Sequence, residues 1–171
     1  MGFGFVTGIR PCRNSDWAAI LAIVNVAAEA YRGLIPADQW REPYMSREEL
    51  EREVTSGVMF WGCEEDCMLI GVMGLQTMRD VDLIRHAYVL PGSQRHGIGS
   101  ALLDHLESFS NRRKLVGTWQ AASWAIRFYQ RHGFEMVAPT RKDLLLKTYW
   151  NVPDRQIETS VVLANPRLEE I

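Results

Sequence analysis

Residues 87–101 decide the fold, and they read Ala87-Tyr88-Val89-Leu90-Pro91-Gly92-Ser93-Gln94-Arg95-His96-Gly97-Ile98-Gly99-Ser100-Ala101. A strand that begins at Val81 stops at Pro91-Gly92, and a helix begins near Gly97 after a short loop. The first N–H groups of a helix have no intrahelical partner, and the helix dipole adds positive potential there. Gly97 and Gly99 carry no Cβ, so phosphate oxygens can reach these groups. The stretch therefore predicts a pyrophosphate site.

Two other phosphate-binding motifs do not fit this loop. The P-loop requires Gly-Lys followed by Ser or Thr, whereas Gly97 and Gly99 are followed by Ile98 and Ser100. The dinucleotide-binding fingerprint wants a small residue three positions after its second glycine, where this chain has Leu102. The strand that precedes the dinucleotide-binding fingerprint is also the first strand of its domain, whereas the strand that begins at Val81 is the fourth in this chain. The glycines alone would also suit close packing of a helix on a sheet.

Strands and helices alternate on both sides of this stretch, which predicts an α/β protein with a mixed sheet. Strands are expected at 7–13, 58–63, 68–78, 81–90, 115–119, 134–137 and 157–163. Helices are expected after Ser15, after the capping box formed by Ser46 and Glu49, from near Gly97, and over 123–132. Residues 32–43 and 139–155 are expected to be irregular.

The composition is that of one ordinary globular domain. The chain has 171 residues, of which 47% are hydrophobic and 23% charged, so we expect a single domain over 1–171 with its core at about 7–163. A net charge of −2 gives no reason to expect nucleic acid or an anionic membrane as a partner. The basic run 112–114 is interpreted as a solvated helix end. A homodimer remains compatible with the sequence.

Targeting and redox signals point to the cytoplasm. No apolar run approaches the length of a membrane span, and no signal peptide is evident. The myristoylation pattern that Met1-Gly2 would begin fails at Val6. Three cysteines without a signal peptide indicate reduced thiols, and Cys63 and Cys67 have no second pair of ligands, so no metal site is expected.

Two separated motifs together resemble the GNAT superfamily of N-acetyltransferases. The run Gln94-x-x-Gly97-x-Gly99 is similar to its motif A, [Arg/Gln]-x-x-Gly-x-[Gly/Ala]. Residues 125–134, Ala-Ile-Arg-Phe-Tyr-Gln-Arg-His-Gly-Phe, are similar to its motif B, Ala-x-x-Phe-Tyr-x-x-x-Gly-Phe. The order of the expected elements over about 7–163 is also that of the superfamily. The resemblance implies a central mixed sheet of about seven strands flanked by helices.

The resemblance also implies acetyl-CoA as cosubstrate and assigns roles to individual residues. The backbone of Ala87, Tyr88 and Val89 would bind the pantetheine arm. Tyr129 would protonate the departing thiolate. The pyrophosphate loop would comprise Gln94, Arg95, His96, Gly97, Ile98, Gly99 and Ser100. One position departs from the family, which often has Asn three residues before the Ala of motif B, where this chain has Ala122.

No residue can be assigned from the sequence as the base that deprotonates the attacking amine. The position at which some members of the superfamily carry an acid is Leu83. Asp82 and His86 are nearby, but strict alternation along the strand puts them on the face opposite Leu83, and only a bulge would re-aim one of them. The sequence therefore favours a chain of waters. Arg85 should face the acceptor, where it would either bind an anionic group or pair with one of the chain's own carboxylates.

Acetyl transfer from acetyl-CoA to a primary amine of a small molecule or peptide is the expected activity. The amine would attack the thioester directly in a ternary complex, because no cysteine occupies a position suited to an acyl-enzyme. The alternative is a regulatory module that binds CoA and transfers nothing. The missing base and Ala122 favour this alternative, whereas the presence of Tyr129 argues against it.

Overall fold

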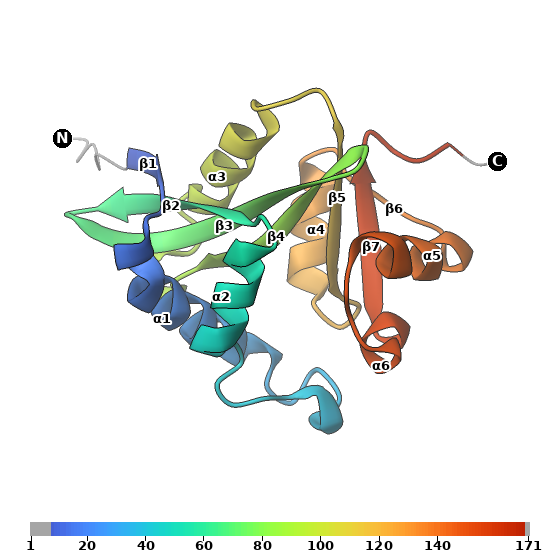
Figure 1. The fold of residues 1–171 in the computed structure, drawn as a ribbon, viewed down its shortest axis with the longest axis horizontal. Helices are drawn as coiled ribbons and strands as arrows, with labels where there is room; N and C mark the ends of the chain where they lie inside the picture. Colours follow the sequence, from blue (N-terminus) through green and yellow to red (C-terminus); the bar gives the residue numbers. More distant parts are fainter. Residues whose placement is uncertain (1–7, 170–171) are drawn as a thin grey trace. The chain divides into compact units, whose positions relative to one another are not determined.

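The computed structural model describes residues 8–169 (Figure 1). Its strands are β1 (Gly8–Pro11), β2 (Met59–Glu65), β3 (Met68–Met78), β4 (Val81–Val89), β5 (Arg113–Trp119), β6 (Glu135–Met136) and β7 (Ser160–Asn165). Its α-helices are α1 (Trp17–Ala27), α2 (Arg47–Thr55), α3 (Ile98–Glu107), α4 (Ser123–Arg131), α5 (Pro139–Tyr149) and α6 (Asp154–Glu158). The expected start of the first strand, Thr7, lies outside the described residues.

The strands form one mixed sheet, which confirms the predicted α/β class. The order across the sheet is β1-β2-β3-β4-β5-β7-β6. Strands β4 and β5 are parallel, whereas β1–β2, β2–β3, β5–β7 and β6–β7 are antiparallel. The parallel pair needs a crossover connection, and α3 supplies it.

The chain folds into two compact units, and β4 contributes to both. The first unit comprises the described residues up to Ala30 together with Arg41–Gln76 and Arg85–Asn111. The second comprises Tyr31–Trp40, Thr77–Ile84 and the chain from Arg112 onward. Each unit has its own apolar cluster.

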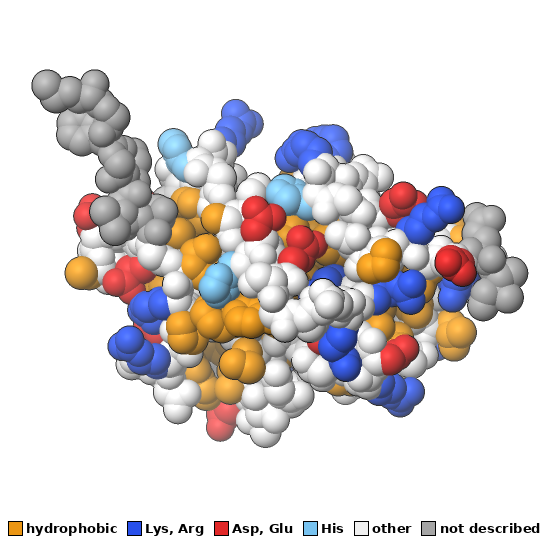
Figure 2. Space-filling model, turned by 90° about the horizontal axis from the view of Figure 1, so that it is seen from above, with side chains coloured by type: hydrophobic (Ala, Val, Ile, Leu, Met, Phe, Trp, Pro, Cys, Tyr) orange, Lys and Arg blue, Asp and Glu red, His pale blue; other side chains and the backbone are white. Residues whose placement is uncertain are grey.

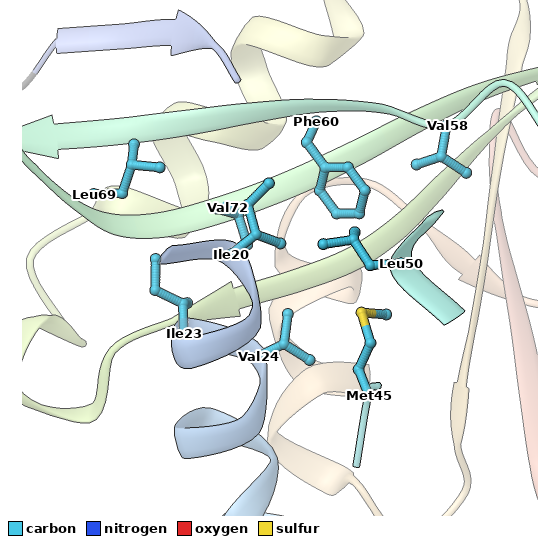
Figure 3. Close-up of a cluster of buried hydrophobic side chains, with 9 residues drawn as sticks. All are labelled: Ile20, Ile23, Val24, Met45, Leu50, Val58, Phe60, Leu69 and Val72. Carbon is cyan, nitrogen blue, oxygen red and sulfur yellow. The ribbon is translucent and has the colours of Figure 1, made fainter. Parts of the chain in front are cut away.

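The core of the first unit joins α1 and α2 to strands β2 and β3 (Figure 3). The side chains that meet there are Ile20, Ile23, Val24, Met45, Leu50, Val58, Phe60, Leu69 and Val72. Ser46 begins α2 as predicted, because its Oγ accepts a hydrogen bond from the N–H of Glu49 at 3.1 Å. Along β3 successive residues face opposite sides, so Gly71, next to Val72, lies against Ile98 and Leu102 of α3.

The core of the second unit lies between α5, α6 and strands β4, β5 and β7. It gathers Val81, Leu83, Leu115, Val137, Leu146, Ile157, Val162 and Ala164. Gly117 of β5 faces Trp150 and Leu146, and a Cβ there would be in ordinary contact, at 3.5 Å from the nearest Trp150 atom.

The prediction that residues 139–155 are irregular is wrong, because α5 and the first two residues of α6 lie there. Pro139 occupies the first turn of α5, where a proline loses no hydrogen bond. Three leucines in succession hide the helical period, since Leu146 is buried while Leu144 is 66% exposed. Ile157 belongs to α6, and the last strand begins only at Ser160.

The basic run 112–114 is not a solvated helix end. Lys114 lies in β5 and is only 4% exposed. Its Nζ is 3.4 Å from Oδ2 of Asp82, whose Oδ1 accepts hydrogen bonds from Arg112 Nε at 3.1 Å and Thr77 Oγ1 at 3.0 Å. A buried charge needs such partners, so Asp82 has a structural role and is removed from the candidates for a catalytic base.

Candidate active site

The loop that follows β4 is anchored at one end to β3 and at the other to the last residue of β4. The N–H of Leu90 donates to the carbonyl of Ile70 in β3 at 2.8 Å. Gln94 Nε2 reaches back to the carbonyl of Val89 at 3.1 Å. The polar residue of motif A therefore closes the loop onto the end of β4 and sets where α3 begins.

Two left-handed residues direct the loop into α3. Arg95 has φ of +67° and Gly97, the N-cap of α3, has φ of +76°. A Cβ on Gly97 would meet no atom within 4 Å, so glycine is needed there for its backbone conformation and not for space. Residues 94–97 are exposed, whereas Ile98 is buried. The first turn of α3, whose N–H groups have no partner within the helix, therefore follows directly on an exposed loop that an anion can reach.

The position of α3 depends on a close approach to β3. A Cβ on Gly71 would lie 3.0 Å from Cγ2 of Ile98 and 3.3 Å from Cγ2 of Val89. Those distances are shorter than ordinary contacts, so a side chain at this position would displace the first turn of α3. Gly71 therefore helps to fix the loop that motif A forms.

The second half of β4 leaves an edge without a strand partner in β5. The pairs between the two strands run from Val81–Arg113 to Ile84–Val116, and none joins Arg85–Val89 to β5 in the described chain. Backbone groups of Ala87, Tyr88 and Val89 are thus placed where an extended ligand can add to the strand. All three residues are half-buried.

Strand β4 contains a kink at His86, which has φ of +54°. The kink breaks the strict alternation expected along a strand, so two consecutive side chains reach one carboxylate. Arg85 Nη2 lies 3.1 Å and His86 Nε2 3.5 Å from Oε1 of Glu53 in α2. Arg85 Nη1 also donates to Oε1 of Gln76 at 2.9 Å. Of the two readings of Arg85, pairing with the chain's own carboxylate is the one the structure shows.

Glu53 was not identified from the sequence, and no local signal singled it out. It lies in the run Arg-Glu-Glu-Leu-Glu-Arg-Glu of α2, which looks like a charged outer face. Burial raises the pKa of Glu53, but the contact with His86 and the charges of His86, Arg85 and Arg52 outweigh it, so the net shift is downward. Glu53 is therefore an anion at neutral pH.

Tyr129 is buried in the second unit on α4, and only 4% of it is exposed. Its ring packs edge-on against Phe128 and Phe134, with centroids 5.1 and 5.4 Å away. The Tyr129 hydroxyl has no hydrogen-bond partner among residues 8–169. Burial raises the pKa of Tyr129, and Tyr31 adds to the increase. The phenol therefore holds its proton more firmly than a solvated tyrosine does.

The ten residues predicted to bind the cosubstrate lie together in the first unit. Ala87–Val89 are on β4, Gln94–Gly97 form the loop, and Ile98–Ser100 open α3. Tyr129 belongs to the second unit. Ala122, the position that departs from the family, is the N-cap of α4 and is 1% exposed, so it offers no polar side chain to a ligand.

Other kinds of site find little support in the described part of the chain. There, no group of three or more His, Cys, Asp or Glu side chains is arranged to hold a metal ion, and the cysteines are unpaired. None of the helices within 8–169 has the length and apolar character needed to cross a bilayer. Basic and acidic side chains are interspersed over the face shown in Figure 2.

Comparison with known proteins identifies the family. The model of the acetyltransferase (GNAT) domain matches residues 25–146, which is more than half of the chain. The chain belongs to the GNAT acetyltransferases. It is 28% identical over 130 residues to the peptidyl-lysine N-acetyltransferase YiaC of Escherichia coli K12, a match that covers 75% of this chain and 84% of the relative.

Solved GNAT structures share the fold at low sequence identity. The PaiA N-acetyltransferase of Thermoplasma acidophilum, solved with coenzyme A, has a TM-score of 0.70 at 19% identity, over 92% of this chain and 97% of its own. The ribosomal-protein-S18-alanine N-acetyltransferase of Escherichia coli has a TM-score of 0.66 at 17% identity, over 93% and 92% of the two chains. The GNAT fold that motifs A and B predicted is therefore confirmed.

Proposed function

We propose that this GNAT chain transfers the acetyl group of acetyl-CoA to a primary amine. The observation that carries the proposal is the accessible loop at the start of α3, with Arg95 and Gly97 in left-handed conformations directly after β4. Pyrophosphate binds at the loop Gln94–Ser100, where α3 begins, and the pantetheine arm adds to the backbone of Ala87–Val89, as the family resemblance implies. The coenzyme A in the Thermoplasma PaiA structure supports this choice of cosubstrate.

A lysine side chain in a peptide is the acceptor class that we test first. The relative YiaC is a peptidyl-lysine N-acetyltransferase, and it matches 75% of this chain. Other proteins with this fold are named for different acceptors, among them the ribosomal-protein-S18-alanine N-acetyltransferase of Escherichia coli. The acceptor therefore has to be chosen by experiment from a panel that contains both kinds of amine.

The proposed reaction is a direct attack in a ternary complex. The lone pair of the neutral amine attacks the thioester carbon, the C–S bond breaks, and the amide and a thiolate are formed. Of the two protons that an ammonium group loses, one leaves before the attack and the other ends on the sulfur. Tyr129, whose pKa is raised by burial, donates a hydrogen bond to the developing thiolate and does not give up its proton early.

Residues 1–171 act as a single N-acetyltransferase domain in this proposal, with a core at about 7–163. The family model supports this, because residues 25–146 include parts of both compact units. A cytoplasmic location and a homodimer stay predictions from the sequence.

Thiol release from acetyl-CoA tests the proposed function. The purified chain is mixed with acetyl-CoA and, in turn, an Nα-acetylated lysine peptide, a peptide with N-terminal alanine, or spermidine. We expect release of free thiol with one of these amines and a product that has gained one acetyl group by mass spectrometry. Saturable binding of acetyl-CoA with no product from any amine would instead identify a regulatory module.

A further inference from the structure

We infer that His86 and Glu53 form a dyad that removes the proton from the acceptor amine, with Arg85 and Gln76 as positioning residues. The inference rests on the proposed function and names the base to which the sequence alone assigns no residue. A lysine-like amine has a pKa near 10.4, so only about one molecule in a thousand is neutral at pH 7.5. A proton acceptor beside the thioester takes up the proton that the ammonium form has to lose before it attacks.

The direction of the bound cosubstrate brings its thioester next to His86. Pyrophosphate lies at the loop after β4, so an arm that adds to the strand passes Val89, Tyr88 and Ala87 in that order. The residue reached next is His86, and the thioester end of the arm comes to this point of β4. The amine has to approach the same point, because it attacks the thioester carbon.

The kink in β4 aims His86 at Glu53. A φ of +54° is unusual for a residue with a side chain, and such conformations persist where the surroundings impose them. Gly74 makes room for the kink, because a Cβ there would lie 3.0 Å from the carbonyl oxygen of Arg85 and 2.8 Å from Cγ1 of Val58. Phe60, whose side chain also reaches the first core (Figure 3), stacks on the imidazole with centroids 5.8 Å apart.

The position of Glu53 favours one tautomer of the His86 imidazole. Nε2 of His86 is buried and has no hydrogen-bond partner at normal distance among the described residues. The polar group that faces it is the carboxylate of Glu53, whose Oε1 lies 3.5 Å away. A carboxylate can only accept, so it favours the tautomer with the proton on Nε2. The lone pair of the other nitrogen, Nδ1, is then free, and the His86 side chain keeps 17% of its surface exposed.

A chain of hydrogen bonds holds Glu53 in position. Arg85 donates to Glu53 and to Oε1 of Gln76, and Nε2 of Gln76 donates to the carbonyl of Ser56, one turn after Glu53, at 3.0 Å. Gln76 is 4% exposed, so these bonds form in a site largely closed to water. The cations facing Glu53 are His86 when protonated, Arg85, and Arg52 on its own helix.

The proton balance of the step is complete. Nδ1 of His86 accepts one proton from the acceptor's ammonium group, and the carboxylate of Glu53 stabilises the imidazolium that results. The neutral amine attacks the thioester, the second proton ends on the sulfur of CoA, and His86 then releases its proton to solvent. No metal, oxidant or further co-reactant is needed.

The test compares the pH dependence of variants on the amine that the wild type accepts from the panel. His86→Asn is chosen because asparagine tolerates a positive φ and so preserves the kink. We expect kcat/KM for the amine to fall about 100-fold at pH 7.5, within the range of general base catalysis. The loss should shrink as pH approaches 10, because the amine then loses its proton to solvent. A loss that stays constant from pH 7 to 10 would show a structural role and overturn the inference.

Glu53→Gln keeps the size of the side chain and removes its charge. We expect kcat/KM for the amine to fall about tenfold at pH 7.5, with unchanged affinity for acetyl-CoA by calorimetry. Glu51→Gln, an exposed residue of the same helix, is the matched control and should leave turnover at the wild-type rate. Equal rates for wild type and Glu53→Gln would remove Glu53 from the dyad.

Imidazole nitrogen NMR tests the dyad without any acceptor. The chain has four histidines, and the signal missing from His86→Asn identifies His86. We expect Nε2 to carry the proton in the wild type, and this preference to weaken in Glu53→Gln. A wild-type proton on Nδ1 would overturn the inference. Failure of the wild type to acetylate any amine would instead refute the proposed function, so the two failures are distinguishable.

Discussion

Gly97 and Gly99 are two residues apart but meet different requirements. Gly97 has φ of +76° and open space around it, so a side chain there is excluded by backbone conformation. Gly99 is the second residue of α3. The family resemblance implies that the phosphates lie close to the backbone at this position. A substitution at Gly99 therefore tests the anion site without disturbing the left-handed turn.

Gly99→Asp should weaken the binding of acetyl-CoA at least tenfold, which corresponds to about 1.4 kcal/mol. The carboxylate would repel the phosphates, and the Cβ would occupy the space through which they approach. Calorimetric titration of the folded variant measures the change. Gly99→Asn adds nearly the same volume without charge and should lose less affinity. Wild-type affinity in Gly99→Asp would place the phosphates elsewhere.

Tyr129→Phe keeps the aromatic packing against Phe128 and Phe134 and deletes the hydroxyl. General acid catalysis is typically worth about 10²–10⁴-fold, and the raised pKa of Tyr129 makes full proton transfer unfavourable. We therefore expect kcat to fall ten- to a few hundred-fold, an estimate at the lower end of that range. CoA affinity and the melting temperature should hardly change.

Tyr149→Phe is the matched control for that measurement. Its hydroxyl donates to Oδ1 of Asp80 at 2.7 Å in an exposed pair, so its loss should not affect kcat. If Tyr129→Phe turned over as fast as wild type under conditions where the chemical step limits the rate, Tyr129 would have no role in the reaction.

Helix α3 and strand β3 show at the scale of elements how packing supports the site. The helix begins where Ile98 contacts Gly71, so the loop and the sheet are joined through one small residue. Strand β4 is the other element on which the site depends, because its pairing with β5 stops at Ile84 and its kink at His86 re-aims two side chains. Both features arise from contacts between elements distant in sequence.

Gly71→Ala should destabilise the fold by about 1–3 kcal/mol, the usual cost of overpacking. The new methyl group would lie 3.0 Å from Ile98 and 3.3 Å from Val89, so the start of α3 would have to shift. We also expect acetyl-CoA affinity to fall several-fold, because the loop moves with the helix. Denaturant unfolding and calorimetry measure the two effects.

Gly117→Ala is the control for Gly71→Ala, since it makes the same change inside a strand of the second unit. A Cβ at Gly117 meets nothing closer than 3.5 Å, so stability should change by less than about 1 kcal/mol. Loss of acetyl-CoA affinity in Gly117→Ala as large as in Gly71→Ala would show that the contact with α3 is not what supports the loop.

The whole chain should become more stable when acetyl-CoA is bound. A ligand at 100 times its Kd stabilises the folded state by about 2.7 kcal/mol. For a protein of 150–250 residues, each kcal/mol raises Tm by roughly 2–4 °C, so we expect an increase of roughly 5–10 °C in differential scanning calorimetry. At the same concentration, a tenfold loss of affinity in Gly99→Asp should leave about half of the increase.

A Tm that does not respond to acetyl-CoA in the wild type would contradict the cosubstrate assignment. The comparison with Gly99→Asp separates binding at the loop from weak binding elsewhere, because only the former is reduced by the substitution. This comparison therefore separates the two kinds of binding without a cosubstrate that lacks a phosphate group.

The sequence alone determined the features that depend on local backbone chemistry. Gln94, Gly97 and Gly99 indicated the anion loop, because glycine and a helix N-terminus act through a few neighbouring residues. Alternating patterns gave β3 and β4 nearly to the residue, and motif B placed Tyr129 on a helix. Residues 139–155 were missed because the leucines of α5 do not repeat with a single exposed face.

Only the tertiary structure decided which polar side chains meet. Asp82 and His86 looked alike as candidates, but Asp82 is buried against Lys114 and Arg112, whereas His86 faces Glu53 from a kinked strand. Glu53 lies 32 residues before Arg85 in the chain, and its helix looks solvated in sequence. Strand alternation is a local rule, and a kink that long-range packing imposes at one φ angle overrides it.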